Sequence, residues 1–214
     1  MRDVLMTYLA SRIPHDFVKQ VPEALEGAYF EAFRNAEQRC AVPERPRVRG
    51  QLRHYYQNGA LRTLAERHGI EATAAHTEPK GERYTRLVFD DIVLGRTGVR
   101  YANNLPSPAK HRRTIAALNQ RFEPVTGDLF TPYTPGPDDG LGVLLVTVHP
   151  AKESDQSVPS QFVVGVPYSN LKGWHLFEPL AGLLAIYTPM AEQPTADIAF
   201  PTLKKLLQQA EAGN

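Results

Sequence analysis

The chain has 214 residues, of which 42% are hydrophobic and 22% are charged, and this composition excludes a disordered polar chain. It holds no apolar run of about 18 residues, so no membrane span is expected. The net charge is +1, yet residues 1–121 carry 20 Lys and Arg against 13 Asp and Glu, and residues 122–214 carry 4 against 10. The first part is therefore a candidate for binding anions, on nucleic acid or on an acidic protein.

The first residues and the single cysteine indicate a cytoplasmic protein. The opening segment "MRDVLMTYLASR" mixes acidic and polar residues into its apolar positions, unlike the hydrophobic region of a signal peptide. Cys40 is the only cysteine, which excludes an intramolecular disulfide and a cysteine metal cluster. We interpret Cys40 as a small packing residue rather than a catalytic thiol.

Three helices are predicted in the first third of the chain. Apolar residues at helical spacing predict helices over 3–12 and 15–39. The two prolines of "VPERPRVRG" predict an extended stretch over 42–47, from which alternating arginines would project to one side. A third helix is expected over 50–68, and Gly69 is its predicted C-terminal stop.

A small antiparallel sheet and a basic helix should follow. Strands are predicted over 70–78, 84–89 and 92–94, with Asp90 and Asp91 in the turn between the last two. Gly95 and Gly98 predict a further turn, after which "VRYA" pairs again. "SPAKHRRTIAAL" begins a helix over 108–120 that has an unusual concentration of cations in its first turns, where the helix dipole disfavours them.

A proline- and glycine-rich connection over 122–140 marks a soft boundary between a basic α+β region, 1–121, and a β-rich region, 141–214, although a single domain is also compatible with the sequence. Within this connection, "GDLF" at 127–130 is interpreted as a loop anchored in the core, or as a docking segment. The β-rich region should contain strands over 141–149 and 161–169, a strand or short helix over 180–187, and a final helix over 201–212. The predicted fold class is α+β.

The basic residues are the strongest functional signal. Seven of them form the candidate site for nucleic acid or another anion: Arg45, Arg47, Arg49, Arg53, Lys110, Arg112 and Arg113. Tyrosines lie among them in the sequence, and aromatic side chains beside arginines stack on unpaired bases. A solvated basic surface without a ligand is the alternative. His111 shares the predicted apolar stripe of its helix, so we expect it at the edge of the core rather than as a free ligand.

The motifs of common enzymes are absent from the sequence. There is no dinucleotide-binding glycine motif, no P-loop, no nucleophile elbow and no H-E-x-x-H, and no two histidines are four residues apart. Glu78 and Lys80 have the acid-x-Lys spacing of some metal-dependent nucleases, but Pro79 and Gly81 favour a turn. His175 and Glu178 fit an acid–base pair less well than the polar ends of an aromatic segment. No catalytic, cofactor-binding or metal-ligating residue is predicted.

The segments 50–69, 86–99 and 107–119, with "GDLF" and the "GW" at 173–174, resemble uncharacterised bacterial proteins encoded in toxin–antitoxin and phage-defence neighbourhoods. This resemblance implies a non-enzymatic component that acts through protein–protein contact, with the basic face as its contact surface. The alternative is a nucleic-acid-binding module that uses the Arg-rich region 42–121, and a metal-dependent nuclease is the third hypothesis.

Overall fold

A computed structural model describes residues 1–77, 79–100, 104–123 and 140–191, with side chains up to residue 187. The elements follow the order α1 (Arg2–Arg12), α2 (His15–Arg39), α3 (Arg45–Arg67), β1 (Glu71–His76), β2 (Arg83–Phe89), β3 (Ile92–Arg100), α4 (Lys110–Ala117), a 3₁₀ turn (Gln120–Phe122), β4 (Leu141–His149), β5 (Gln161–Pro167), β6 (Trp174–Pro179) and α5 (Leu180–Ala191). The predicted α+β class is confirmed. The part of the chain described here contains no helix long and apolar enough to cross a membrane.

The six strands form one mixed sheet in the order β1-β2-β3-β4-β5-β6. Every neighbouring pair is antiparallel except β3 and β4, which run parallel from the Ile92–Leu141 pair to the Arg100–His149 pair. In the chain, α4 lies between these two strands, as a parallel crossover requires. The sheet is therefore continuous across the two regions of opposite charge.

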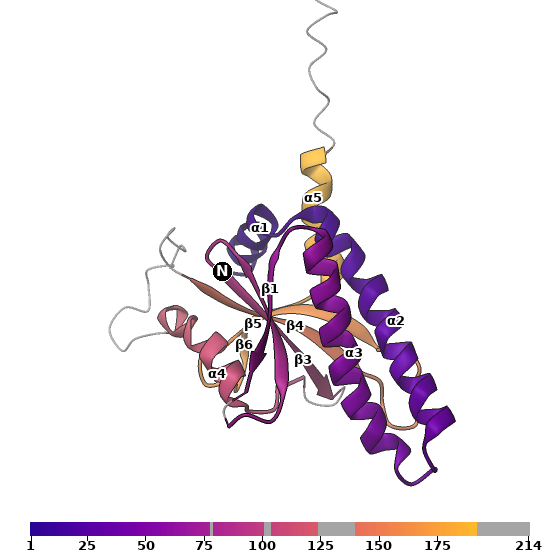
Figure 1. Ribbon diagram of the computed structural model, residues 1–214. Helices are drawn as coiled ribbons and strands as arrows, with labels where there is room; N and C mark the ends of the chain where they lie inside the picture. The colour runs from indigo at the N-terminus through magenta and orange to yellow at the C-terminus, as the bar shows by residue number, and fades with distance from the viewer. Residues whose placement is uncertain (78, 101–103, 124–139, 192–214) are drawn as a thin grey trace, which may run out of the picture.

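Helices cover the two faces of the sheet unequally (Figure 1). The main core combines buried side chains of α1, α2, α3 and α5 with one face of the strands. α4 covers part of the other face, where Ile115 packs against Val99, Val146 and Val163. β4 has apolar residues on both faces, and all its residues before His149 are buried, which explains its nearly continuous apolar sequence.

Two glycines that were expected to flank a turn instead allow close packing. β3 runs without a break through Gly95 and Gly98, so the predicted turn is wrong. A Cβ atom at Gly95 would lie 2.5 Å from Ile115 Cδ1, and one at Gly98 would lie 2.5 Å from His149 Nε2. Across the sheet, a Cβ atom at Gly142 would lie 2.0 Å from the carbonyl oxygen of Ile115. The missing side chains of Gly95 and Gly142 let α4 lie directly on β3 and β4, whereas Gly98 makes room for His149.

The extended backbone predicted over 42–47 is also wrong. This segment is not extended, because α3 begins at Arg45 and Pro46 occupies the first turn, where a missing backbone N–H costs nothing. The helix ends as predicted, next to Gly69 with a φ of +66°. Residues 180–187 belong to α5, which resolves the alternative of strand or helix. The expected helix over 201–212 lies outside the described residues, as does most of the connection 122–140 with "GDLF".

Candidate functional site

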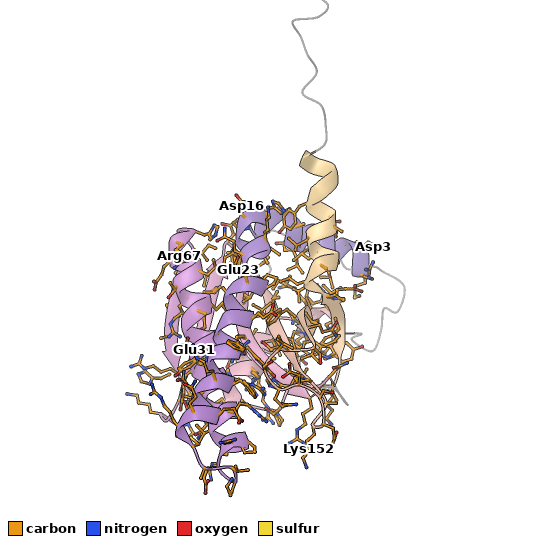
Figure 2. The ribbon with its side chains drawn as sticks, turned by 90° about the vertical axis from the view of Figure 1, so that its right-hand side faces the viewer. Asp3, Asp16, Glu23, Glu31, Arg67 and Lys152 are labelled. Atoms are coloured by element: carbon orange, nitrogen blue, oxygen red, sulfur yellow. The ribbon has the colours of Figure 1, made fainter. Side chains whose placement is uncertain are left out.

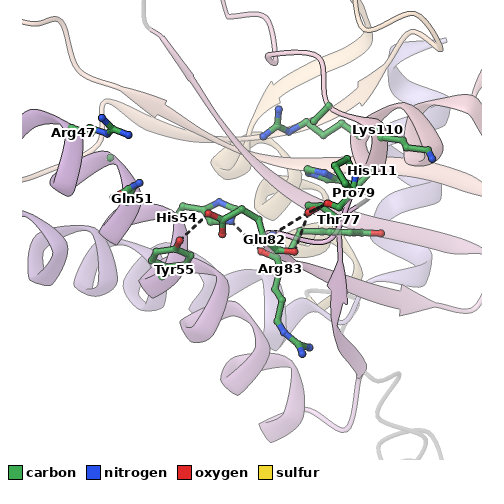
Figure 3. Close-up of a pocket in the computed structure, with 14 residues that line it drawn as sticks. Arg47, Gln51, His54, Tyr55, Thr77, Pro79, Glu82, Arg83, Lys110 and His111 are labelled. Atoms are coloured by element: carbon green, nitrogen blue, oxygen red, sulfur yellow. Dashed lines mark hydrogen bonds between the residues drawn. The ribbon is translucent and has the colours of Figure 1, made fainter.

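A pocket of about 540 Å³ opens where three separate segments meet (Figure 3). One wall is the first half of α3, the second is the turn between β1 and β2, and the third is the start of α4. We call it the basic pocket; its lining residues are Arg47, Gly50, Gln51, His54, Tyr55, Thr77, Pro79, Glu82, Arg83, Tyr84, Ala109, Lys110, His111 and Arg112. In Figure 3, Arg47 and Lys110 lie on opposite sides of it.

The charge of the basic pocket is strongly positive. Among its described lining residues, four are cationic, namely Arg47, Arg83, Lys110 and Arg112, and one is acidic, Glu82. The carboxylate of Glu82 already accepts a hydrogen bond from Tyr55 Oη at 2.9 Å. Four cations around one concave site that has a single acid among its described lining residues attract an anion.

The arginines predicted to project together are divided by the helix. Every fourth residue of α3 from Arg45 contacts every fourth residue of α2 in reverse order: Arg45 with Glu37, Arg49 with Phe33, Arg53 with Tyr29 and Gln57 with Leu25. Arg47 lies about 200° around the helix axis from Arg45 and faces the basic pocket. Arg45, Arg49 and Arg53 therefore hold the two helices together, and Arg47 alone of this group lines the pocket.

The contacts of Arg45 and Arg53 leave little capacity for a ligand. Arg45 Nη1 lies 2.6 Å from Glu37 Oε2, and its Nε donates to the carbonyl oxygen of Cys40. The guanidinium of Arg53 stacks 3.9 Å from the centre of the Tyr29 ring and donates to the carbonyl of Gln156. Burial lowers the pKa of Arg53 to about 10.

The three cations at the start of α4 face two different pockets. Lys110 and Arg112 line the basic pocket, whereas Arg113 lines a second pocket on the other side of the segment 105–108. Arg112 Nη1 donates to the carbonyl and to Oγ of Ser107, the latter at 2.8 Å, which fixes its position. Its Nε is buried and has no hydrogen-bond partner among the described residues.

Aromatic rings border the basic pocket. Tyr84 and His111 stack with ring centres 4.3 Å apart and an interplanar angle of 19°. Tyr55 is 45% exposed at the edge of the same pocket. A flat, exposed ring beside cations is suited to stacking on another planar group.

Beneath the pocket, Arg96 of β3 is buried, with 6% of its surface exposed. It donates to Asn58 Oδ1 at 3.1 Å, to Gln57 Oε1 at 2.7 Å and to the carbonyl of His54 at 3.4 Å. These acceptors are all neutral, and burial lowers the pKa of Arg96 to about 9, with a further contribution from Arg112. A buried cation whose hydrogen-bond acceptors in the described structure are all neutral adds to the positive potential of the pocket above it.

Four histidines are disfavoured as cations. Burial lowers the pKa of His111 and of His149 to about 4, with a smaller contribution from nearby arginines. Burial also lowers the pKa of His54 and of His175. The unfolded chain therefore takes up protons below about pH 6.5 that the folded protein does not bind.

The free energy of unfolding should consequently fall as pH decreases. Because the folded-state pKa values are lowered, the loss begins near pH 6.5 and continues to about pH 4. We expect a loss of about 2 kcal/mol between pH 7 and pH 5, since partial exposure weakens the shifts. Urea unfolding at several pH values measures this loss, and His149→Gln should reduce the slope. An unfolding free energy independent of pH over this range would contradict the burial of neutral histidines.

The other candidate groups do not form a catalytic cluster in the described structure. Glu178 binds Arg2, with Oε2 3.0 Å from Nη2, while His175 packs against the rings of Tyr168 and Phe122. Asp91 accepts a hydrogen bond from Tyr8. Cys40 is a free, half-buried thiol. No group of three His, Cys, Asp or Glu within the described ranges is placed to hold a metal ion, and Glu78 lies outside those ranges.

Comparisons with family models, with curated proteins and with solved structures gave no match.

Proposed function

We propose that the protein binds single-stranded nucleic acid, with backbone phosphates held in the basic pocket by Arg47, Lys110 and Arg112. One observation carries the proposal. Two segments far apart in the chain, 47–55 and 109–112, place three cations around one pocket that has a single acid among its described lining residues. Arginine donates two parallel hydrogen bonds to a phosphate, so the arginines of the pocket suit this anion.

The aromatic residues favour an unpaired strand over a duplex. Tyr55 and Tyr84 present rings beside the cations, and an unpaired base can stack on such a ring without breaking a base pair. Stacking and phosphate contacts tolerate different base sequences. We therefore expect the protein to prefer single strands, with little dependence on the base sequence. The proposed location is the cytoplasm.

Fluorescence anisotropy with labelled 12-mers of deoxythymidine and of uridine tests the proposal, with a DNA duplex of the same length as competitor. We expect single strands to bind more tightly than the duplex. The three phosphate contacts of the basic pocket should contribute about −2 to the slope of log Kobs against log salt concentration. Phosphate contacts are strongest at low salt, so binding should be detected at about 50 mM. Absence of binding to both 12-mers at this salt concentration would overturn the proposal.

Protein–protein contact in a bacterial toxin–antitoxin or phage-defence system is the second candidate. A groove of about 700 Å³ between α2 and α3 favours it, because the groove passes Gly27 and Gly59, where a Cβ atom would have no neighbour within 4 Å. The outward face of α2 carries Asp16, Glu23 and Glu31 (Figure 2). A one-to-one partner whose binding survives Arg47→Glu would support this candidate through the groove, and one whose binding is lost would support contact through the basic face.

A further inference from the structure

A second pocket, of about 660 Å³, lies beside the basic pocket and is also cationic. Arg100 from the end of β3, Arg113 from α4 and Lys172 from the turn between β5 and β6 line it, and its described lining residues include no acid. These residues come from three separate parts of the chain. The concentration of positive charge is thus repeated at a second site and does not depend on one helix.

The two pockets are neighbours along the chain. Pro108 lines the second pocket, and the next residue, Ala109, lines the basic pocket. The hydrogen bonds from Arg112 to Ser107 join a residue of the basic pocket to a residue of the second pocket. Among the described residues, Pro108 and Ala109 thus lie at the boundary between the two sites.

Close packing and a hydrogen bond fix the position of His149 in the wall of the second pocket. His149 lies over Gly98, since a Cβ atom at Gly98 would be 2.5 Å from His149 Nε2. Its Nδ1 lies 3.2 Å from Tyr29 Oη, and Tyr29 is fully buried beneath Arg53. A larger residue at position 98 would displace His149. The glycine and the hydrogen bond therefore fix one side of the pocket in place.

We propose that the basic pocket, the segment 107–113 and the second pocket form one continuous track for a nucleic-acid strand, so that the ligand is an oligonucleotide rather than a mononucleotide. This inference rests on the proposed function. One strand would place phosphates at Arg47 and Lys110 on one side of the segment and at Arg113 and Lys172 on the other. A nucleic-acid strand carries regularly spaced phosphates, so one strand can place phosphates in two adjacent cationic pockets at once.

The test compares oligonucleotides of two lengths on the full chain and on Arg113→Ala/Lys172→Ala. Both side chains are exposed, so their truncation should leave the core intact, which circular dichroism would check. We expect the wild-type protein to bind a deoxythymidine 12-mer at least tenfold more tightly than a 3-mer. The variant should lose at least fivefold in affinity for the 12-mer, and its salt slope should be smaller by about 1.4, since each single-strand phosphate contact contributes about 0.7.

The outcomes separate the two proposals. If the wild-type protein binds neither oligonucleotide, the proposed function fails. If it binds the 12-mer and the variant binds equally well with the same salt slope, the track is wrong and the basic pocket acts alone. The variant Lys19→Ala/Arg67→Ala, with the same loss of charge, is the control and should match the wild type. A uridine 12-mer distinguishes RNA from DNA, and tighter binding of a glutamate 12-mer would overturn the track in favour of an acidic protein partner.

Discussion

Replacement of Arg47 and Lys110 by glutamate should weaken binding of a single-stranded 12-mer by at least about 100-fold, because two charge-assisted hydrogen bonds of about 1.5–3 kcal/mol each are lost and repulsion takes their place. The two residues are on different walls of the basic pocket and are both exposed. Neither belongs to the contacts between α2 and α3, so the fold should be retained. Fluorescence anisotropy at a fixed salt concentration measures the loss.

The control for this variant has the same change in charge at a distant place. Lys19 and Arg67 lie at the far end of the α2–α3 pair, where the rings of Phe17 and His68 meet at 5.9 Å. Arg67 is roughly 30 Å along α3 from Arg47 at the rise of an α-helix. Lys19→Glu/Arg67→Glu should reduce affinity only slightly. Equal losses in both variants would mean that net charge, and not the basic pocket, governs binding.

Replacement of Gln57 by leucine should lower the free energy of unfolding by about 2–3 kcal/mol, because a buried charged donor loses one of its acceptors. Gln57 is fully buried, and its Oε1 accepts from Arg96 at 2.7 Å and from Thr147 at 3.4 Å. Leucine has a similar size but no acceptor, so Arg96 would keep only Asn58 and the carbonyl of His54. Chemical denaturation measures the change.

A matched substitution lies on the same helix. Gln51 is exposed at the edge of the basic pocket, so Gln51→Leu should change the free energy of unfolding by less than about 0.5 kcal/mol. A small effect of Gln57→Leu, similar to that of Gln51→Leu, would show that Arg96 does not depend on its neutral acceptors. The positive potential beneath the pocket would then need another explanation.

Elements with a strong local signal could be predicted from the sequence. The amphipathic pattern of α2 and the apolar run of β4 are long enough to determine their structure, and Gly69 supplies the positive φ at the end of α3. The start of α3 has no clear local signal, because Pro46 is also compatible with extended backbone. Proline is equally compatible with the first turn of a helix.

The spacing of the arginines predicts which of them share a face only once the secondary structure is known to be a helix. Arg45, Arg49 and Arg53 are spaced by four, which places them on one face of a helix, whereas Arg47 is out of that series. Once residues 45–53 are known to be helical, the separation of Arg47 follows. Its position across the pocket from Lys110 does not follow, because that position depends on how α4 packs against the sheet.

The network around Arg96 has no signal in the sequence. An arginine in a strand is expected at the surface, and Gln57 and Asn58 interrupt the apolar pattern of α3 without indicating a partner. Their contact joins α3 to β3 across the core and arises only from tertiary packing. The parallel pairing of β3 with β4 is of the same kind, since it depends on the crossover through α4.

The central claim is that Arg47 in the basic pocket contacts a phosphate of a bound single strand. The most direct test is the slope of log Kobs against log salt concentration for the wild-type protein, Arg47→Ala and Arg67→Ala. We predict that Arg47→Ala reduces the magnitude of the slope by about 0.7, the contribution of one phosphate contact, and that Arg67→Ala leaves it unchanged. Identical slopes for all three proteins would contradict the claim.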